Sequence, residues 1–423
     1  MFAWTMLAAV SVACQEAPQG ATKPAGETQA EIVSRRAPTA AEKAAGGAAK
    51  AERPRVEAVF VLDTTGSMSG LIQAAKEKIW SIANTLASAK PTPDVKIGLV
   101  AYRDRGDDYV TKTTPLGADL DLMYRELMKF QAGGGGDGPE SVNQALHEAV
   151  TNIAWSKDAK TYRVIFLVGD YPPHMDYQDD VKYQTTCEKA AKAGITINAI
   201  QCGDFAETTP IWSDIARLAE GRFFKVEQSG GAMLASTPFD GKLAELAGKL
   251  DGTRVYYGVQ PVQKELKDRD ATDAVAIKSA PAAAQAQRAK FNASESGRDN
   301  FSRGALIGGS GFAGGALKPG DKAGELVQDL ADKRVKLDEL KAEELPEELK
   351  KLPPAEREKA IAAKAAEREK LQREIRELSE KRQRFLADEA KKQNKKPLES
   401  HLFDCIKEQA GRRGLSYGGG PDL

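Results

Sequence analysis

The sequence predicts an α/β fold, in which a doubly wound, mostly parallel sheet carries helices on both faces and an α-helical region with a short coiled coil follows. Several apolar runs are continuous rather than alternating, which is typical of strands buried on both faces of a parallel sheet. Segments with apolar residues at helical spacing separate these runs. Some of the runs end in aspartate, and such sheets bind ligands at the carboxyl ends of their strands.

The first predicted strand is Val56–Asp63, an apolar run that ends in an acidic residue. A helix is predicted from Ser69 onward, because its apolar residues recur on one helical face. The other predicted strands are Val95–Asp104, Tyr109–Leu116 at the sheet edge, Tyr162–Asp170, Ile195–Gly203 and Arg222–Val226. The other predicted helices are Asp119–Phe130, Pro139–Ala154, Asp179–Lys192, Pro210–Glu220 and Pro238–Leu250. This alternation of strand and helix favours a parallel sheet.

The balanced charge narrows the classes of function. The chain of 423 residues carries 61 basic and 61 acidic residues, whereas a dedicated nucleic-acid-binding protein needs a basic face or tail. Hydrophobic residues make up 41% of the chain, which is enough for at least one packed core. No run of about 18 apolar residues occurs, so the sequence predicts no ordinary transmembrane helix.

Composition divides the chain into five segments. We predict a signal segment at 1–14, a disordered tether at 15–54, the α/β domain at 55–255, a largely disordered linker at 256–320 and a charged helical region at 321–423. The last segment contains a short coiled-coil repeat with one charged interruption. The residues of this repeat are Leu371, Ile375, Leu378, Arg382 and Phe385. Because the repeat is short, a helical hairpin folded on itself or on the α/β domain is favoured over an oligomerisation stalk.

The N-terminal segment resembles a bacterial export signal. Residues 1–13 are apolar and uncharged, and Cys14 follows a small residue, as in lipoprotein signals whose cysteine is lipidated. The segment departs from that pattern at Ser11, where leucine is usual, and in having no Lys or Arg before the apolar run. The resemblance implies an exported protein of the bacterial cell envelope that is anchored through a lipid on Cys14. A cleaved signal peptide and a buried first helix are the alternatives.

Three further cysteines, Cys187, Cys202 and Cys405, show no Cys-x-x-Cys spacing, which argues against a zinc site. Cys187 and Cys202 flank a helix-to-strand connection, so an oxidising envelope permits a disulfide between them. A strand rises about twice as far per residue as a helix, which separates the two positions. The sequence leaves both the paired and the free state open.

Asp63, Thr65 and Ser67 form the motif D-x-[ST]-x-S. A buried strand ends at Asp63 and the following turn opens a helix, so the carboxylate and the two hydroxyls can converge at the end of the sheet. Oxygen ligands of this kind suit a hard divalent cation such as magnesium. Carboxylates gathered at strand ends would repel one another without a cation.

Two further acidic segments strengthen the prediction of a metal site. Asp170 ends another central strand, and Asp137 and Glu140 lie in a glycine-rich loop that precedes a helix. In order and spacing, these segments resemble the metal-ion-dependent adhesion site of the von Willebrand factor A (VWA) family, and residues 55–255 resemble its Rossmann-like domain. The metal ligands that the resemblance implies are Asp63, Thr65, Ser67, Glu140 and Asp170.

The middle element of this site departs from the usual pattern. The family usually has a threonine there, whereas D-G-P-E resembles the D-x-P-E version of integrin β subunits and points to Glu140. Asp137 could then serve a second nearby cation or act through water, and the choice of direct ligand between Asp137 and Glu140 stays open. The additional acid favours tighter metal binding and favours calcium, but it weakens the pull of the metal on a partner carboxylate. Both Mg²⁺ and Ca²⁺ stay open as the bound ion.

The same resemblance implies a function. An open coordination position on the metal would accept an Asp or Glu side chain of a protein or peptide partner, so we expect a binding protein and not an enzyme. An envelope scaffold, in which the metal only stabilises the fold, is the alternative. The membrane is expected to be contacted through the lipid anchor alone, and nucleic acid is not an expected partner. A nucleotide is not expected either, because the glycine run lacks the G-K-[ST] of a phosphate loop.

Two other loops at the same edge carry polar residues of interest. Asp104, Asp107 and Asp108 are expected to form a solvated rim that could add ligands to a second ion. His174 is expected to be a surface or hydrogen-bonding residue rather than a zinc ligand, because no second histidine or cysteine lies near it in sequence.

Overall fold

The computed structural model describes residues 53–136, 138–226, 236–297, 301, 323–393 and 398–418. The predicted signal segment, Cys14 and almost all of the predicted tether lie outside these residues. Within the described residues, no helix combines the length and the hydropathy needed to cross a membrane.

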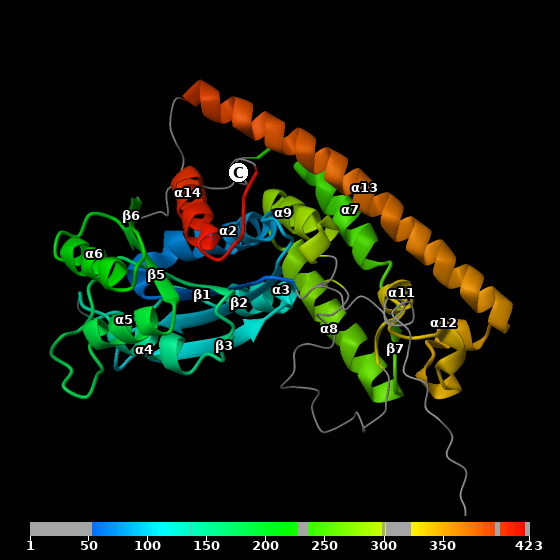
Figure 1. Ribbon diagram of the computed structural model, residues 1–423, viewed down its shortest axis with the longest axis horizontal. Helices are drawn as coiled ribbons and strands as arrows, with labels where there is room; N and C mark the ends of the chain where they lie inside the picture. Colours follow the sequence, from blue (N-terminus) through cyan, green and yellow to red (C-terminus); the bar gives the residue numbers. More distant parts are fainter. Residues whose placement is uncertain are drawn as a thin grey trace, which may run out of the picture. The chain divides into compact units, whose positions relative to one another are not determined.

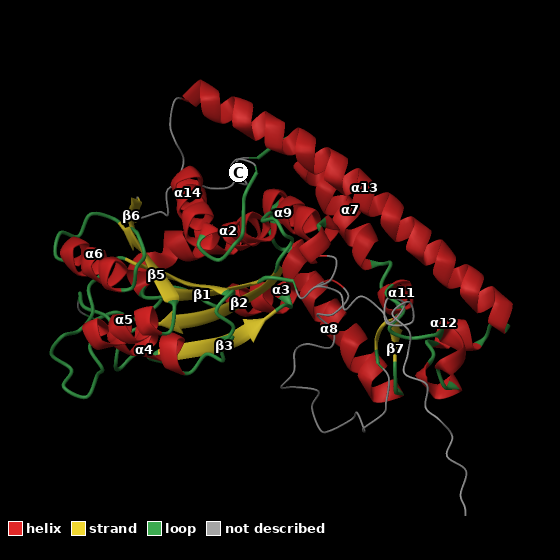
Figure 2. Ribbon diagram, viewed as in Figure 1, coloured by secondary structure: helices red, strands yellow, loops and turns green. Residues whose placement is uncertain are grey.

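A mostly parallel sheet forms the centre of the α/β domain (Figures 1 and 2). In the described part it has six strands in the order β3-β2-β1-β4-β5-β6, and β3 at one edge runs antiparallel to β2. The strands are β1 (Arg55–Asp63), β2 (Asp94–Tyr102), β3 (Thr111–Gly117), β4 (Tyr162–Gly169), β5 (Ile195–Cys202) and β6 (Phe223–Val226). From β1, the strands β2 and β3 are added on one side of the sheet and β4, β5 and β6 on the other. The strand order therefore reverses between β1 and β4, which is where doubly wound sheets place their ligands.

The central strands are buried on both faces, which explains their continuous apolar sequences. Every residue of β4 is buried, and so is β1 apart from Arg55 and Phe60. Asp63 pairs in register with Tyr102 on β2, and Leu62 pairs with Val168 on β4. The carboxyl ends of β1, β2 and β4 are therefore level, and the acidic residues that end or follow these strands meet at one edge of the sheet.

Helices cover both faces of the sheet, which confirms the predicted doubly wound fold (Figure 1). The core under one face contains side chains of α2 (Ser69–Ala87), α3 (Leu120–Met128), α9 (Ala282–Ala293) and α14 (Leu398–Gly411). The core under the other face contains side chains of α4 (Val142–Thr151), α5 (Tyr183–Lys192) and α6 (Thr208–Leu218). Trp80 of α2 and Trp212 of α6 are the largest fully buried side chains in these two cores.

The cysteines of the described part are free and buried. Cys187 lies on α5 in the core under one face of the sheet, whereas Cys202 ends β5 in the core under the other face. Because the sheet separates the two thiols, they form no disulfide. Burial raises the pKa of the Cys187 thiol to about 12, so it is an unreactive core residue.

The structure corrects the predicted linker at 256–320. Its first half forms two helices, α8 (Gln260–Lys278) and α9, while 302–322 lies outside the described residues. The buried alanines of α9 are Ala283, Ala284, Ala286, Ala289 and Ala293, and the helix packs against α2 and α7 (Asp240–Asp251). Alanine is the best helix former, but it gives little contrast in hydropathy. The segment therefore resembles a low-complexity spacer in sequence although it is a packed helix.

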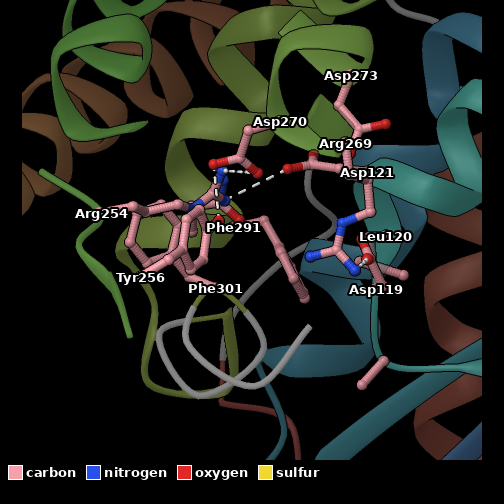
Figure 3. A pocket seen from close by; sticks show the side chains of 12 residues that line it. Asp119, Leu120, Asp121, Arg254, Tyr256, Arg269, Asp270, Asp273, Phe291 and Phe301 are labelled. Carbon is pink, nitrogen blue, oxygen red and sulfur yellow. Dashed lines mark hydrogen bonds and ion pairs between the residues drawn. The ribbon is translucent and has the colours of Figure 1, made fainter. Parts of the chain in front are cut away.

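Buried ion pairs join these helices to the α/β domain. Arg288 of α9 is 1% exposed and donates to Asp121 of α3 (2.6 and 2.7 Å) and to Asp251 of α7 (2.8 and 2.9 Å). Although burial opposes ionisation, Arg288 lowers the pKa of Asp121 to about 2. Figure 3 shows the neighbouring charges of α3 and α8, among which Arg269 lies 3.4 Å from Asp119. These paired charges fix α8 and α9 against α3.

The C-terminal region is helical, as predicted, and its long helix packs within the same chain. The helix α13 (Pro354–Gln393) lies against α7 and α9, and Leu371 and Ile375 share a core with Leu246 of α7. The charged interruption of the repeat, Arg382, is buried and donates to Asp240 at the start of α7 (2.7 Å). The seam predicted for a short coiled coil is therefore an intrachain interface.

Short elements complete this region. The strands β7 (Tyr256–Tyr257) and β8 (Gly324–Glu325) pair antiparallel, and Arg368 of α13 donates to both carboxylate oxygens of Glu325 (2.9 and 2.8 Å). The remaining elements are α11 (Leu326–Ala331), η2 (Leu337–Glu339), η3 (Ala342–Glu344) and α12 (Glu347–Lys350). The helix α12 follows Pro346 and α13 begins at Pro354, since proline is tolerated at a helix start.

The last helix, α14, returns to the sheet. Its Leu402, Phe403 and Ile406 are buried in the core that also contains residues of β1 and β2. Gln409 accepts a hydrogen bond from Tyr162 of β4 (2.7 Å) and exchanges hydrogen bonds with Asn198 of β5 (2.8 and 3.0 Å). A segment far downstream of β6 thus completes the cover of one sheet face.

Candidate metal centre

Asp63 is the last residue of β1, and the chain turns there into η1 (Gly66–Met68) and α2. Thr65 donates both its backbone N–H (2.9 Å) and its hydroxyl (2.7 Å) to Oδ1 of Asp63. The hydroxyl oxygens of Thr65 and Ser67 lie 3.3 Å apart. The turn thus gathers one carboxylate and two hydroxyls at the carboxyl end of β1.

Thr64, the variable residue of the motif, anchors this turn to β2. Its backbone N–H and its hydroxyl both donate to the carbonyl of Tyr102 (2.9 and 2.8 Å). The same hydroxyl lies 2.6 Å from the hydroxyl of Tyr109. These bonds fix the backbone between the two candidate ligands, Asp63 and Thr65.

The glycine run between α3 and α4 docks on the turn. The N–H of Gly66 donates to the carbonyl of Gly134, and the N–H of Gly133 donates to the carbonyl of Thr64 (both 3.2 Å). Gly134 has a φ of +77°, which glycine adopts without strain, and a Cβ there would collide with the Asp107 carboxylate. The glycines therefore let this loop pack closely against the turn that follows β1.

Glu140 is buried beside the same turn. Its N–H donates to the carbonyl of Pro172, and its carbonyl accepts from the N–H of His174 (both 3.0 Å), so the loop after β4 holds it in place. A Cβ on Gly135 would lie 3.2 Å from Oε1 of Glu140 and 3.3 Å from Cβ of Thr65. The side chains of Glu140 and Thr65 therefore border the same small space.

Asp170 follows the last residue of β4 and is buried. Its carbonyl accepts from the hydroxyl of Thr208 at the start of α6 (2.8 Å). A Cβ on the preceding Gly169 would lie 2.4 Å from the Tyr102 hydroxyl and 3.0 Å from Oδ2 of Asp63. Because Gly169 has no side chain, the carboxylate of Asp63 can approach the end of β4. There the charge of Asp170 acts on the Asp63 carboxylate and disfavours its ionised form.

Electrostatic repulsion at this edge is strong. Burial and the neighbouring Asp170 raise the pKa of Asp63 to about 7, although the hydrogen bonds from Thr65 oppose this shift. Burial, followed by the charges of Asp63 and Asp104, raises the pKa of Glu140 to about 9. Ionised forms of these acids need a nearby positive charge.

The donor set fits a divalent cation. Oδ2 of Asp63 and Oε2 of Glu140 are buried and accept no hydrogen bond from any described residue. Carboxylate and hydroxyl oxygens are hard ligands that suit Mg²⁺ or Ca²⁺. Across the described residues, no group of three His, Cys, Asp or Glu side chains is arranged to hold a metal by itself. A cation at this edge would therefore depend on the hydroxyls of Thr65 and Ser67 as well.

Asp137, the sixth metal residue proposed from the sequence, lies outside the described residues. The other five all lie at the carboxyl edge of the sheet. They are Asp63, Thr65, Ser67, Glu140 and Asp170.

The expected solvated rim is partly buried. Asp104 is 5% exposed, accepts hydrogen bonds from the hydroxyls of Ser141 and Tyr177 (both 2.9 Å), and lies 3.3 Å from Nε2 of His174. His174 is a hydrogen-bonding residue, as expected, but it is buried rather than on the surface. Asp104 is the second residue after β2, and Asp170 is the first residue after β4. A sequence signal for Asp104 is therefore its place just beyond the carboxyl end of a buried strand.

An open pocket borders the candidate site. Its cavity of about 460 Å³ is lined by Ser67, Asp170, Tyr171, Asp204 and Phe205. The rings of Tyr171 and Phe205 lie 4.7 Å apart, and Phe205 is 39% exposed. No periodic or motif signal in the sequence marks these two aromatic residues, because they lie on loops that follow different strands.

Fold and site together define a class of protein domain: a doubly wound α/β domain with acids and hydroxyls gathered where its first strand ends. Residues 57–227 match the family model of the von Willebrand factor A domain. The chain therefore contains a VWA domain. The elements from α7 onward lie beyond the matched residues.

The chain is similar to segments of much longer proteins. It is 27% identical over 122 residues to the alpha-protein kinase vwkA of Dictyostelium discoideum, a match that covers 28% of this chain and 19% of the kinase. It is 35% identical over 114 residues to von Willebrand factor A domain-containing protein 7 of Rattus norvegicus, which covers 27% of this chain and 12% of that protein. The chain thus spans less than a fifth of the length of these curated relatives.

Among solved structures, the conserved hypothetical protein BatB from Bacteroides thetaiotaomicron is similar to this chain at 16% sequence identity, with a TM-score of 0.32. The match covers 41% of this chain and 90% of BatB.

Proposed function

We propose that the VWA domain holds a divalent cation, Mg²⁺ or Ca²⁺, and uses it to bind a protein or peptide partner. Asp63, Thr65, Ser67 and Glu140 would hold the cation, with Asp170 beside them. The bound cation would supply a coordination position for an Asp or Glu side chain of the partner. In this proposal Glu140 replaces the usual threonine of the family, Asp137 serves a second ion, and the role is binding rather than catalysis.

One observation carries this proposal. Oδ2 of Asp63 and Oε2 of Glu140 are buried without a hydrogen-bond donor among the described residues, beside the hydroxyls of Thr65 and Ser67. Burying an uncompensated carboxylate costs several kcal/mol, so the fold keeps these acids only with protons or with a cation. A hard cation would offset that cost and draw on the hydroxyl oxygens at the same time.

Isothermal titration calorimetry of the full chain with Mg²⁺ and with Ca²⁺ tests the metal site. We expect saturable binding to the wild-type chain, loss of binding in Asp63→Ala and retention of binding in Asp404→Ala, an exposed acid on α14. Equal binding heats in the wild-type and Asp63→Ala chains would contradict the assignment of the metal site to the end of β1.

We also propose that the chain is exported and anchored in the bacterial envelope through a lipid on Cys14. The support is the apolar, uncharged segment before this cysteine and the polar tract after it. Metabolic labelling with palmitate should mark the wild-type chain and not Cys14→Ser, and labelling of both would contradict lipidation at Cys14.

A scaffold function is the second candidate, and the packing of α9 and α14 on the sheet favours it. These helices join the C-terminal region to the VWA domain, as an assembly platform requires. Chelation separates the two candidates. If chelation lowers the melting temperature but leaves the captured partners unchanged, the metal is structural; if chelation releases the partners, the metal takes part in binding.

A further inference from the structure

We infer that Tyr171 and Phe205 form an apolar subsite beside the metal centre. The partner would then be a basic peptide segment in which an acidic side chain lies next to an aromatic or aliphatic one. This inference rests on the proposed function, because the acidic side chain is the group that the cation would bind. It adds a second determinant of partner choice, located on the loops after β4 and β5.

The geometry places the two determinants in one pocket. Ser67 and Asp170 of the candidate metal centre line the same cavity of about 460 Å³ as Tyr171 and Phe205. This volume falls within the range of about 300–1,000 Å³ that is usual for ligand pockets. Neighbouring side chains of one peptide can therefore occupy the metal end and the aromatic end together.

The backbone that carries the aromatic pair is held firmly. The carbonyl of Tyr171 accepts a hydrogen bond from the indole of Trp212 (3.2 Å), which is fully buried in the core under α6. The carbonyl of Phe205 accepts from the side-chain amide of Gln201 on β5 (2.9 Å). A subsite built on fixed backbone loses little conformational entropy when a partner binds.

The exposed apolar residues concentrate at this edge. In the part of the chain that the structure describes, the large hydrophobic residues with exposed side chains are Met175, Val181, Phe205 and Val275. Met175, Val181 and Phe205 belong to the loops that leave β4 and β5, whereas Val275 lies on α8. Of these residues, Phe205 lines the pocket, and an exposed apolar side chain inside a pocket is available to a partner.

The negative charge of the surrounding loops favours a partner with basic residues on either side of its acidic side chain. In the part of the chain that the structure describes, the five loops at the carboxyl edge carry eleven acidic and three basic residues, a formal charge of −8. These loops are 63–68, 103–110, 131–141, 170–182 and 203–207. A bound divalent cation neutralises only part of this charge. A partner acid would therefore be accepted at the cation alone, while Lys or Arg flanking it would complement the rim.

Fluorescence anisotropy of labelled peptides on the full chain tests this subsite. The peptides share one Gly-Ser frame with flanking lysines and differ only in a central Glu-Phe, Glu-Gly or Gln-Phe pair. With saturating Mg²⁺ or Ca²⁺, we expect Glu-Phe to bind roughly tenfold more tightly than Glu-Gly. We expect no saturable binding of Gln-Phe.

Variants of the chain test whether the preference for Glu-Phe over Glu-Gly depends on Phe205. In Phe205→Ala, the Glu-Phe peptide should bind no better than Glu-Gly, while the metal affinity measured by calorimetry stays at the wild-type value. In Phe205→Leu, which retains an apolar side chain, part of the preference should remain. Val275→Ala, the matched exposed apolar residue on α8, should change neither measurement.

Two results would overturn the inference. The first contradicts only the subsite, whereas the second also contradicts the proposed partner binding. If the wild-type chain binds Glu-Phe and Glu-Gly equally, or if Phe205→Ala keeps the preference, the subsite is wrong while the proposed metal-dependent binding stands. If the chain binds the metal but neither glutamate peptide, both the subsite and the proposed partner binding are wrong.

Discussion

Asp63 and Glu140 have pKa values of about 7 and about 9, first because both carboxyls are buried and then because other acids surround them. A cation must displace the protons that these groups hold, so protons compete with the metal below those pKa values. We expect the affinity for Mg²⁺ to rise between about pH 6 and about pH 9, with protons released on binding in that window. Calorimetry in buffers of different ionisation enthalpy measures both quantities.

The matched variant for this prediction is Glu140→Gln, which removes one titrating ligand. Its metal binding should be weaker and should release fewer protons at about pH 7 than that of the wild-type chain. A wild-type affinity that does not change across this pH range would show that neither acid takes part in binding.

Gly169 controls how closely β4 approaches Asp63. A Cβ there would lie 2.4 Å from the Tyr102 hydroxyl and 3.0 Å from Oδ2 of Asp63, both of them buried. Gly169→Ala should therefore displace Asp63, destabilise the domain by about 1–3 kcal/mol and weaken metal binding. Gly136→Ala, at a glycine with open space around it, is the control. Urea unfolding and calorimetry check the prediction, and identical curves for the two variants would contradict it.

Residues of the candidate site differ in how far the sequence could reveal them. Asp63, Thr65 and Ser67 lie within one turn, so their spacing alone predicts that they converge. Tyr171 and Phe205 follow different strands, and they meet only because β4 and β5 are neighbours in the sheet. No short-range pattern records such a contact.

At the level of elements, the strands were predictable because burial on both faces demands continuous apolar sequence. The helix α9 was not, because alanines and the paired Arg288 carry its buried face in place of large apolar residues. Hydropathy patterns detect contrast between faces, and α9 has little contrast. The same reasoning explains the coiled-coil repeat of α13: sequence gives the apolar seam but not the partner that covers it.

The interface between α13 and α7 supplies an element-scale prediction. Arg382 and Asp240 are both buried and form an ion pair across it (2.7 Å). Arg382→Ala would leave the Asp240 carboxylate buried with one fewer partner, so we expect a loss of about 3 kcal/mol in unfolding free energy. Arg384→Ala, at an exposed position on the same helix, should cost less than about 0.5 kcal/mol. Chemical denaturation of both variants measures the difference, and equal losses would contradict the assignment of α13 to this interface.

At the scale of the whole molecule, the helix α14 links the C-terminal region to the VWA domain. The family match ends at residue 227, but α14 covers part of one face of the sheet within the matched domain. Ile406 of α14 is 1% exposed in the core shared with β1 and β2. Ile406→Ala should cost about 2–4 kcal/mol and lower the stability of the strands and the C-terminal helices together. Lys407→Ala, at the adjacent exposed position, should have little effect.

Hydrogen exchange followed by mass spectrometry checks this prediction, since it reports the stability of each segment separately. Peptides from β1, β4 and α14 should all exchange faster in Ile406→Ala. Unchanged protection of β1 and β4 would show that α14 is dispensable for the VWA domain.

The central claim is that the end of β1 holds a divalent cation, and anomalous X-ray diffraction from crystals of the full chain grown with Mn²⁺ tests it most directly. Manganese accepts the same oxygen ligands as magnesium and scatters anomalously. We expect one strong difference peak bordered by Asp63, Ser67 and Glu140, absent from crystals of Asp63→Ala. A bound Mn²⁺ that appears only elsewhere on the chain, or no peak at the end of β1, would contradict the claim.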